Sequence, residues 1–135
     1  MSRACLDAGV ISLYYQKAPP KKIIELFEDI KKGKISAFVP GVILVEVFKH
    51  LCVAGGKDYA TSCIRSFLQT GRPTLISLTP ELVLNAGHLK CRFRTVLSYN
   101  DSILVATALK EKVKLHTTEK NLPSIHELKV VSYEF

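Results

Sequence analysis

Four carboxylates interrupt otherwise apolar stretches of the sequence. They are Asp7 after residues 4–6, Glu46 within Val-Ile-Leu-Val-Glu-Val-Phe, Asp101 at the start of an apolar stretch, and Glu119 after residues 113–117. A carboxylate beside a hydrophobic core is costly unless it is paired, protonated or bound to a cation. A divalent cation removes the repulsion between clustered carboxylates, and oxygen ligands favour Mg²⁺ or Mn²⁺ over zinc. The four acids therefore predict a magnesium or manganese site, which can activate water and stabilise phosphoryl charge.

The elements that must position these acids alternate between strands and helices. The expected strands are residues 4–6, 35–39, 75–78, 113–117 and 128–132, and the expected helices are residues 9–15, 20–32, 42–53, 57–69, 80–93 and 98–109. This alternation favours an α/β domain with a parallel sheet, in which ligands collect at the carboxyl ends of the strands. Asp7, Asp101 and Glu119 then lie at one sheet edge.

Two of the helices carry further expectations. The helix at residues 42–53 is apolar nearly all round in its first half, which predicts a buried helix, and we expect Glu46 to point its side chain back toward the same sheet edge. The helix at residues 57–69 has an apolar stripe formed by Tyr59, Cys63, Ile64, Phe67 and Leu68.

Length and composition indicate one domain, residues 1–135, that buries a core of its own. The hydrophobic fraction is 47% and the charged fraction 23%, which excludes intrinsic disorder. No apolar run approaches the roughly 18 residues of a membrane span, and Asp7 precedes any signal-peptide apolar region. The four cysteines are scattered without metal-ligand or disulfide spacing. We therefore expect a cytoplasmic protein with reduced thiols and no membrane partner.

The charge balance favours a polyanionic partner. Nineteen lysines and arginines against twelve acids give a formal net charge of +7. Such a surface attracts nucleic acid, although net charge says nothing about the fold. An acidic metal site in a basic protein is the electrostatic arrangement of a metal-dependent nuclease.

Each acid also has a simpler explanation. Asp101 stands three residues after Ser98, so the two can form a helix cap. Asp7 can open a turn at a strand end, Glu46 can neutralise a buried lysine or arginine, and Glu119 can be a solvated loop acid. These explanations require four independent coincidences, whereas one metal site accounts for the whole set.

In four motifs that span nearly the whole chain, the sequence resembles the PIN-domain family of ribonucleases. The first is a strand ending in aspartate, the second a helix glutamate after the second strand, the third Leu-Ser-x-x-Asp-x-x-x-x-Ala-x-Ala, and the fourth a strand followed by Thr-x-Asp. They correspond to residues 6–11, 39–46, 97–108 and 115–122. All four occur in order and at family spacing.

The resemblance implies a Rossmann-like three-layer α/β/α sandwich around a mostly parallel sheet. It also implies hydrolysis of RNA by an endonuclease that uses Mg²⁺ or Mn²⁺. Small stand-alone members similar to VapC are toxins of toxin–antitoxin pairs, usually homodimers inhibited by a small antitoxin protein. RNA, an antitoxin and a second copy of the chain are thus the expected partners.

The resemblance also assigns roles to residues. Catalytic residues would be Asp7, Glu46, Asp101 and Glu119, with Asp7, Asp101 and Glu119 as metal ligands. Asn100 and Thr117 would support the site by hydrogen bonding, although ordinary loop and strand-end roles are as good an explanation. Lys90, Arg92 and Arg94 precede the Asp101 loop and could hold RNA phosphates, whereas a solvated helix end is the more frequent meaning of such a cluster.

Three positions depart from the family pattern. Gly9 stands where a serine, threonine or asparagine is usual, Glu119 replaces an aspartate, and Asn121 is neutral at a position that is sometimes acidic. We expect one metal ion to bind and a second to bind poorly, with reduced activity as a possible result.

Other functions compete with a toxin. An RNA-processing nuclease of the same family is one, although cysteines of a metal ribbon and a second domain are absent from the sequence. A catalytically weak RNA-binding or protein-interaction module is another, supported by Gly9, Glu119 and Asn121. A response-regulator receiver domain needs paired acids near the first strand, where Asp7 stands alone.

Overall fold

A five-stranded sheet lies at the centre of the computed structural model, which describes residues 2–134. The strands are β1 Ser2–Leu6, β2 Ile35–Pro40, β3 Thr74–Ile76, β4 Lys114–Thr117 and β5 Val130–Ser132. They pair in the order β3-β2-β1-β4-β5, and all four pairings are parallel. The strand order reverses between β1 and β4, the position where α/β sheets open a crevice at their carboxyl ends.

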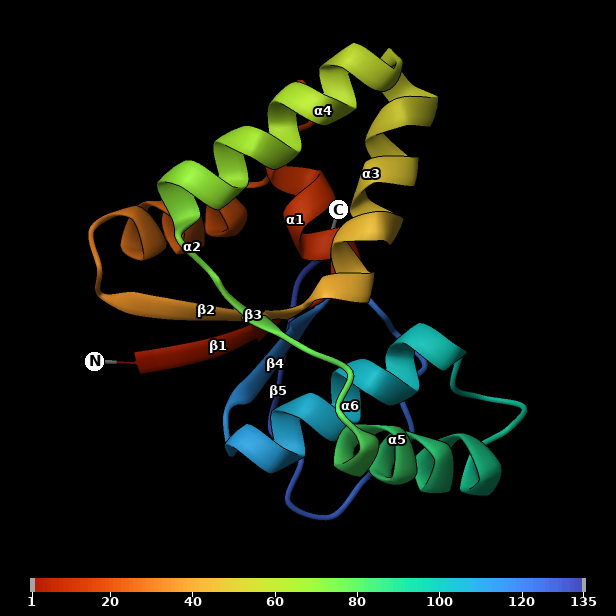
Figure 1. Cartoon of the computed structure of the whole chain (residues 1–135). Helices are drawn as coiled ribbons and strands as arrows, with labels where there is room; N and C mark the ends of the chain where they lie inside the picture. Colours follow the sequence, from red (N-terminus) through yellow and green to blue (C-terminus); the bar gives the residue numbers. More distant parts are fainter. Residues whose placement is uncertain (1, 135) are drawn as a thin grey trace.

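Helices cover both faces of the sheet, as the three-layer expectation requires. They are α1 Ala8–Tyr14, α2 Lys21–Lys31, α3 Gly41–Gly55, α4 Lys57–Ser66, α5 Pro80–Arg92 and α6 Tyr99–Glu111. Figure 1 shows α1 to α4 on one side of the sheet and α5 and α6 on the other. None of the helices within residues 2–134 is long and apolar enough to cross a membrane.

Local signals in the sequence define the starts of α5 and α6. Thr79 caps α5 by accepting a hydrogen bond from the Leu82 amide at 3.2 Å, and Pro80 follows as the first helical residue. Ser98 caps α6 by accepting from the Asp101 amide at 3.0 Å. Asp101 is thereby fixed in the first turn of α6.

The core is formed by the central strand and the helix faces turned toward the sheet. Its largest fully buried side chains include Leu6, Ile11, Ile23, Phe27, Ile43, Phe67, Leu104 and Leu115. Ala4, Cys5 and Leu6 of β1 are all buried because helices cover both faces of that strand.

The expectation of a helix buried nearly all round at residues 42–53 is wrong. In α3, Ile43, Val47 and Leu51 are buried, whereas Val45 is 69% and Val53 80% exposed. One face of α3 packs against α1, α4 and β2, so the opposite apolar face remains on the surface.

The helix expected at residues 57–69 also differs in its end and its apolar stripe. The α-helix stops at Ser66 and continues as a π-helical turn, Phe67–Gly71. Phe67 is buried in the core, but Tyr59 and Leu68 are more than one-third exposed. For Leu68, the wider π turn changes the angular spacing on which the predicted stripe depended.

Candidate active site

The four carboxylates come from four elements that meet at the carboxyl edge of the sheet. Asp7 follows β1, and Glu119 lies two residues beyond the end of β4. Glu46 stands in the second turn of α3, which begins directly after β2, and Asp101 in the first turn of α6. They therefore surround the point between β1 and β4 where the strand order reverses.

A buried threonine connects two of these acids. The Thr117 hydroxyl donates to Asp7 Oδ2 at 2.5 Å and accepts from the Glu119 amide at 2.9 Å. Thr117 is 1% and Asp7 8% exposed. Burial raises the pKa of the Asp7 carboxyl, the Thr117 hydrogen bond opposes that rise, and the charge of Glu46 adds to it.

Glu46 is held by an amide and an imidazole. Asn100 Nδ2 donates to Glu46 Oε1 at 2.7 Å, and His50 Nε2 lies 3.7 Å from Glu46 Oε2. The other ring nitrogen of His50 is hydrogen-bonded to the Ser12 hydroxyl at 3.0 Å. The predicted contact of Asn100 with the acids is thus present, and it links α6 to α3.

His50 is a neighbour of the acids that our sequence analysis did not select. Its spacing of four residues from Glu46 on one helix was an available signal, because such residues share a helix face.

Asp101 is electrostatically coupled to two other acids of the set. Burial raises the pKa of its carboxyl, the Ser98 hydroxyl opposes the rise, and the charges of Asp7 and Glu119 raise it further. The Ser98 cap considered in the sequence analysis is present, and it leaves the carboxylate among its charged neighbours.

The protein's own cations do not neutralise this group. Within residues 2–134, no lysine or arginine forms an ion pair with any of the four carboxylates, and His50 is the one basic side chain paired with Glu46. The simpler explanation for Glu46, a buried lysine or arginine partner, therefore does not apply.

The donor chemistry fits a hard divalent cation because every candidate ligand is a carboxylate oxygen. In the described part of the chain, no three His, Cys, Asp or Glu side chains are grouped closely enough to hold a metal ion. The acids are thus electrostatic neighbours that do not converge on one point.

Gly9, the first departure from the family pattern, has a steric cause. A Cβ atom at this position in α1 would overlap the hydroxyl of Thr118 and lie 3.3 Å from its other side-chain atoms. Thr118 therefore fills the space that a side chain at position 9 would need.

The basic residues before Asp101 lie at the end of α5 and in the loop that follows. Lys90 Nζ donates to the carbonyl oxygens of Arg94 at 2.9 Å and Leu97 at 2.6 Å, so its ammonium group ties this loop to α5. Arg92 lies over the Phe93 ring and is exposed, as is Arg94.

Comparison with known proteins places the chain in a sequence family. The PIN domain family profile matches residues 4–128. No curated protein matches the sequence.

Solved structures share the fold over nearly the full chain. VapBC2 from Rickettsia felis, bound to a DNA fragment from its promoter, matches at a TM-score of 0.79 with 17% identity, over 98% of this chain and 99% of that one. FitAcB from Neisseria gonorrhoeae matches at 0.69 with 11% identity, over 94% and 95%. VapC20 from Mycobacterium tuberculosis, a Sarcin-Ricin loop cleaving toxin, matches at 0.68 with 14% identity, over 85% and 87%.

Proposed function

This chain belongs to the PIN domain family, and from that premise we propose that it is an endoribonuclease dependent on Mg²⁺ or Mn²⁺. One observation carries the proposal. Carboxylates whose charges raise the pKa of Asp7 and of Asp101, without a lysine or arginine partner in residues 2–134, gather at the sheet edge where the strand order reverses. Stability alone gives no reason to place such groups together.

The roles of the residues follow from their contacts. Asp7, Asp101 and Glu119 would hold the cation once their side chains converge on it, and the bound cation would activate water and neutralise charge on the scissile phosphodiester. Glu46, oriented by Asn100 and His50, would accept the proton of the attacking water. Thr117 would fix the orientation of the Asp7 carboxylate.

The basic character of the protein supports RNA as the substrate. The net charge of +7 attracts a polyanion, and the exposed Arg92 and Arg94 precede the Asp101 loop in the sequence. Lys90 would contribute less to RNA binding, because backbone carbonyls already engage its ammonium group.

We further propose that the protein is the toxin of a toxin–antitoxin pair in the cytoplasm. The similar solved structures include VapBC and FitAB toxin–antitoxin complexes. All four cysteines are free, as suits a reducing compartment. A small antitoxin would be its inhibitor, and a homodimer its working form.

Expression in a bacterial host tests the toxin assignment. The wild-type chain expressed alone should arrest growth, and a small co-encoded protein should relieve the arrest. Asp101→Asn should abolish the arrest, whereas Asp58→Asn, at an exposed aspartate of α4, should retain it. Unimpaired growth with soluble wild-type protein would contradict the assignment and favour an RNA-processing nuclease.

Calorimetry with Mn²⁺ tests the metal site separately. We expect one ion per chain, since Asn121 offers no charged ligand for a second. Tight binding of two ions would contradict this expectation.

A catalytically weak RNA-binding module is the second candidate. It is favoured by the absence, in residues 2–134, of three acids grouped closely enough to hold a metal. Such a module would retard RNA in a gel without cutting it in either Mg²⁺ or Mn²⁺.

A further inference from the structure

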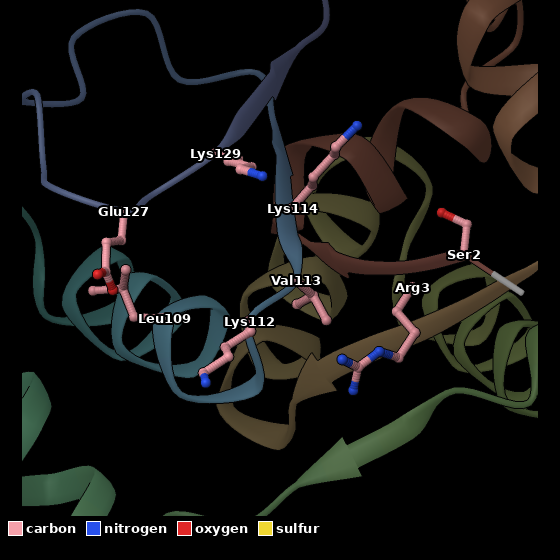
Figure 2. Close-up of a pocket in the computed structure, with 8 residues that line it drawn as sticks. All are labelled: Ser2, Arg3, Leu109, Lys112, Val113, Lys114, Glu127 and Lys129. Atoms are coloured by element: carbon pink, nitrogen blue, oxygen red, sulfur yellow. The ribbon is translucent and has the colours of Figure 1, made fainter.

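A basic pocket opens at the opposite edge of the sheet from the carboxylates. Its volume is about 320 Å³. We call it the amino-edge pocket, and its residues are Ser2, Arg3, Leu109, Lys112, Val113, Lys114, Glu127 and Lys129. Figure 2 shows these side chains around the beginnings of β1 and β4.

Backbone pairing fixes Lys114 and Lys129 beside each other. Lys114 is paired with Ala4 across β1 and β4, so its side chain leaves the sheet on the face opposite to that of Arg3. The Leu115 amide donates to the Lys129 carbonyl at 2.9 Å, so Lys129 is held beside the start of β4. The backbone of Lys112 adopts the left-handed helical conformation, with φ of 55°, at the turn between α6 and β4.

Arg3 is held in place by two contacts. One guanidinium nitrogen donates to the Glu111 carbonyl at 3.1 Å, and the group lies 5.6 Å from the centre of the Phe38 ring. Because a guanidinium offers five N–H donors, donors remain for an anion while these contacts orient the side chain.

The pocket carries an uncompensated positive charge. Within residues 2–134, none of its four cations forms an ion pair, and its one acid, Glu127, lies 3.6 Å from His126 instead. Like charges gathered at one edge of the sheet repel one another and create a positive potential there. A bound anion with several acceptor oxygens would relieve that repulsion.

We propose that the amino-edge pocket binds a phosphate group in the backbone of the RNA strand, as a second contact remote from the cutting site. The pocket and Asp7 stand at opposite ends of β1, and the four-residue step from Arg3 to Asp7 covers about 13 Å. Because helices cover both faces of β1, an RNA strand has to pass over a helix layer, so at about 3.4 Å of rise per nucleotide the two contacts lie more than four stacked nucleotides apart. This inference rests on the proposed function, because it assigns part of the substrate.

Fluorescence anisotropy with a labelled single-stranded RNA of about 12 nucleotides tests the site. The protein is the full chain carrying Asp101→Asn, with EDTA present, so that binding is measured without cleavage. We expect Lys112→Gln/Lys129→Gln to weaken binding about tenfold and to reduce the slope of log affinity against log salt by about 1.4. Lys112→Arg/Lys129→Arg should bind as the parent does, because the charges remain.

A matched control removes the same charge elsewhere. Lys17→Gln/Lys57→Gln alters two exposed lysines outside the pocket and should change affinity less than twofold. Equal losses in the two Gln variants would overturn the site, because they would show only the effect of net charge. Binding of inorganic phosphate in the pocket with unchanged RNA affinity would also overturn the RNA assignment.

Failure of this inference is distinguishable from failure of the proposed function. If wild-type protein cuts RNA and the pocket variant binds RNA normally, only the pocket assignment fails. If the pocket variant loses binding while wild-type protein cuts nothing in any metal, the phosphate site stands and the nuclease assignment fails.

Discussion

At the scale of single residues, Asp7 illustrates how function and stability oppose each other. Its carboxylate is 8% exposed, and both burial and Glu46 raise its pKa. A raised carboxyl pKa means that the charged form destabilises the fold at neutral pH. Packing and stability alone therefore give no reason for a carboxylate at position 7.

Asp7→Asn should stabilise the protein and abolish RNA cleavage together. The amide still accepts the Thr117 hydrogen bond and removes the desolvated charge. We expect the thermal midpoint at pH 7 to rise by roughly 3 to 5 °C, or about 1 kcal/mol for a domain of this size. Calorimetry checks it, with the exposed Asp58→Asn as control. A lower midpoint for Asp7→Asn would show that the charge stabilises the fold.

Gly9 and Thr118 form a second residue-scale pair. Gly9→Ala should destabilise the protein by about 1 to 2 kcal/mol, despite the better helix propensity of alanine, because the new methyl group overlaps Thr118. In the double variant Gly9→Ala/Thr118→Ala, most of the lost free energy of unfolding should be recovered. Urea unfolding of the four proteins in this cycle measures the coupling. If Gly9→Ala alone stabilises the protein, the steric account of this glycine is wrong.

His116 makes the stability of the fold depend on pH in the acidic range. Burial, with a smaller contribution from Lys114, lowers the pKa of its imidazole to about 4, and the ring is hydrogen-bonded to the Tyr133 hydroxyl at 2.7 Å. The unfolded chain takes up this proton near pH 6.5, so the stabilisation is complete above that pH and is lost as pH falls toward about 4.

His116→Gln should flatten this part of the pH profile. In the wild type the free energy of unfolding should fall by up to about 3 kcal/mol between pH 6.5 and 4 from this group. Asp7 and Asp101 have the opposite effect on stability as the pH falls, because their raised pKa values favour proton uptake by the folded state. The difference between wild type and variant isolates His116, and His88→Gln, at an exposed histidine, should keep the wild-type slope.

Sequence patterns can select the candidate acids but not the side chains that surround them. Asp7 follows an apolar run and Asp101 precedes one. Both could be selected because a charge beside an apolar run needs an explanation. The contact of Thr118 with Gly9 could not be predicted, since it depends on the relative positions of α1 and the segment after β4. The same holds for the link from Asn100 to Glu46, which joins residues 54 positions apart.

At the scale of elements, α3 is the helix whose apolar content exceeds what the core can bury. Its buried face reaches the core through Ile43, Val47 and Leu51, while Val45 and Val53 stay exposed. Composition alone gave no means of telling core from surface on this helix. The exposed face supports the proposed homodimer, because an apolar face left on a monomer favours association.

Val45→Glu/Val53→Glu should therefore yield a monomer. Both side chains are on the surface, so the fold should remain intact while the apolar face acquires two charges. Light scattering should report about half the wild-type mass, with an unchanged circular dichroism spectrum. Wild-type protein that is already monomeric at high concentration would contradict the dimer proposal.

Strand and helix order were predictable because the alternation of apolar runs and turn signals is local. Each of the five expected strands overlaps one in the structure, and α6 begins with the Ser98 cap that its spacing to Asp101 indicates. The end of α4 was not predictable, because the π-helical turn at Phe67–Gly71 follows from how Phe67 reaches the core.

At the scale of the whole molecule, charge is separated between the two edges of one sheet. The carboxylates lie where β1 and β4 end, and the cations of the amino-edge pocket lie where the same strands begin. A polyanion is attracted to the basic edge, whereas the acidic edge becomes favourable for it only when a cation is bound. This separation is consistent with a single strand that contacts both edges.

RNA cleavage tests the central claim most directly. An end-labelled mixed RNA is incubated with wild-type protein, Asp101→Asn and Asp58→Asn, each with Mg²⁺, Mn²⁺ or EDTA. The account predicts metal-dependent fragments with the wild type and Asp58→Asn, and none with Asp101→Asn or with EDTA. Intact RNA under every condition with folded, antitoxin-free wild-type protein, or equal cleavage by Asp101→Asn, would contradict a metal-dependent ribonuclease centred on these carboxylates.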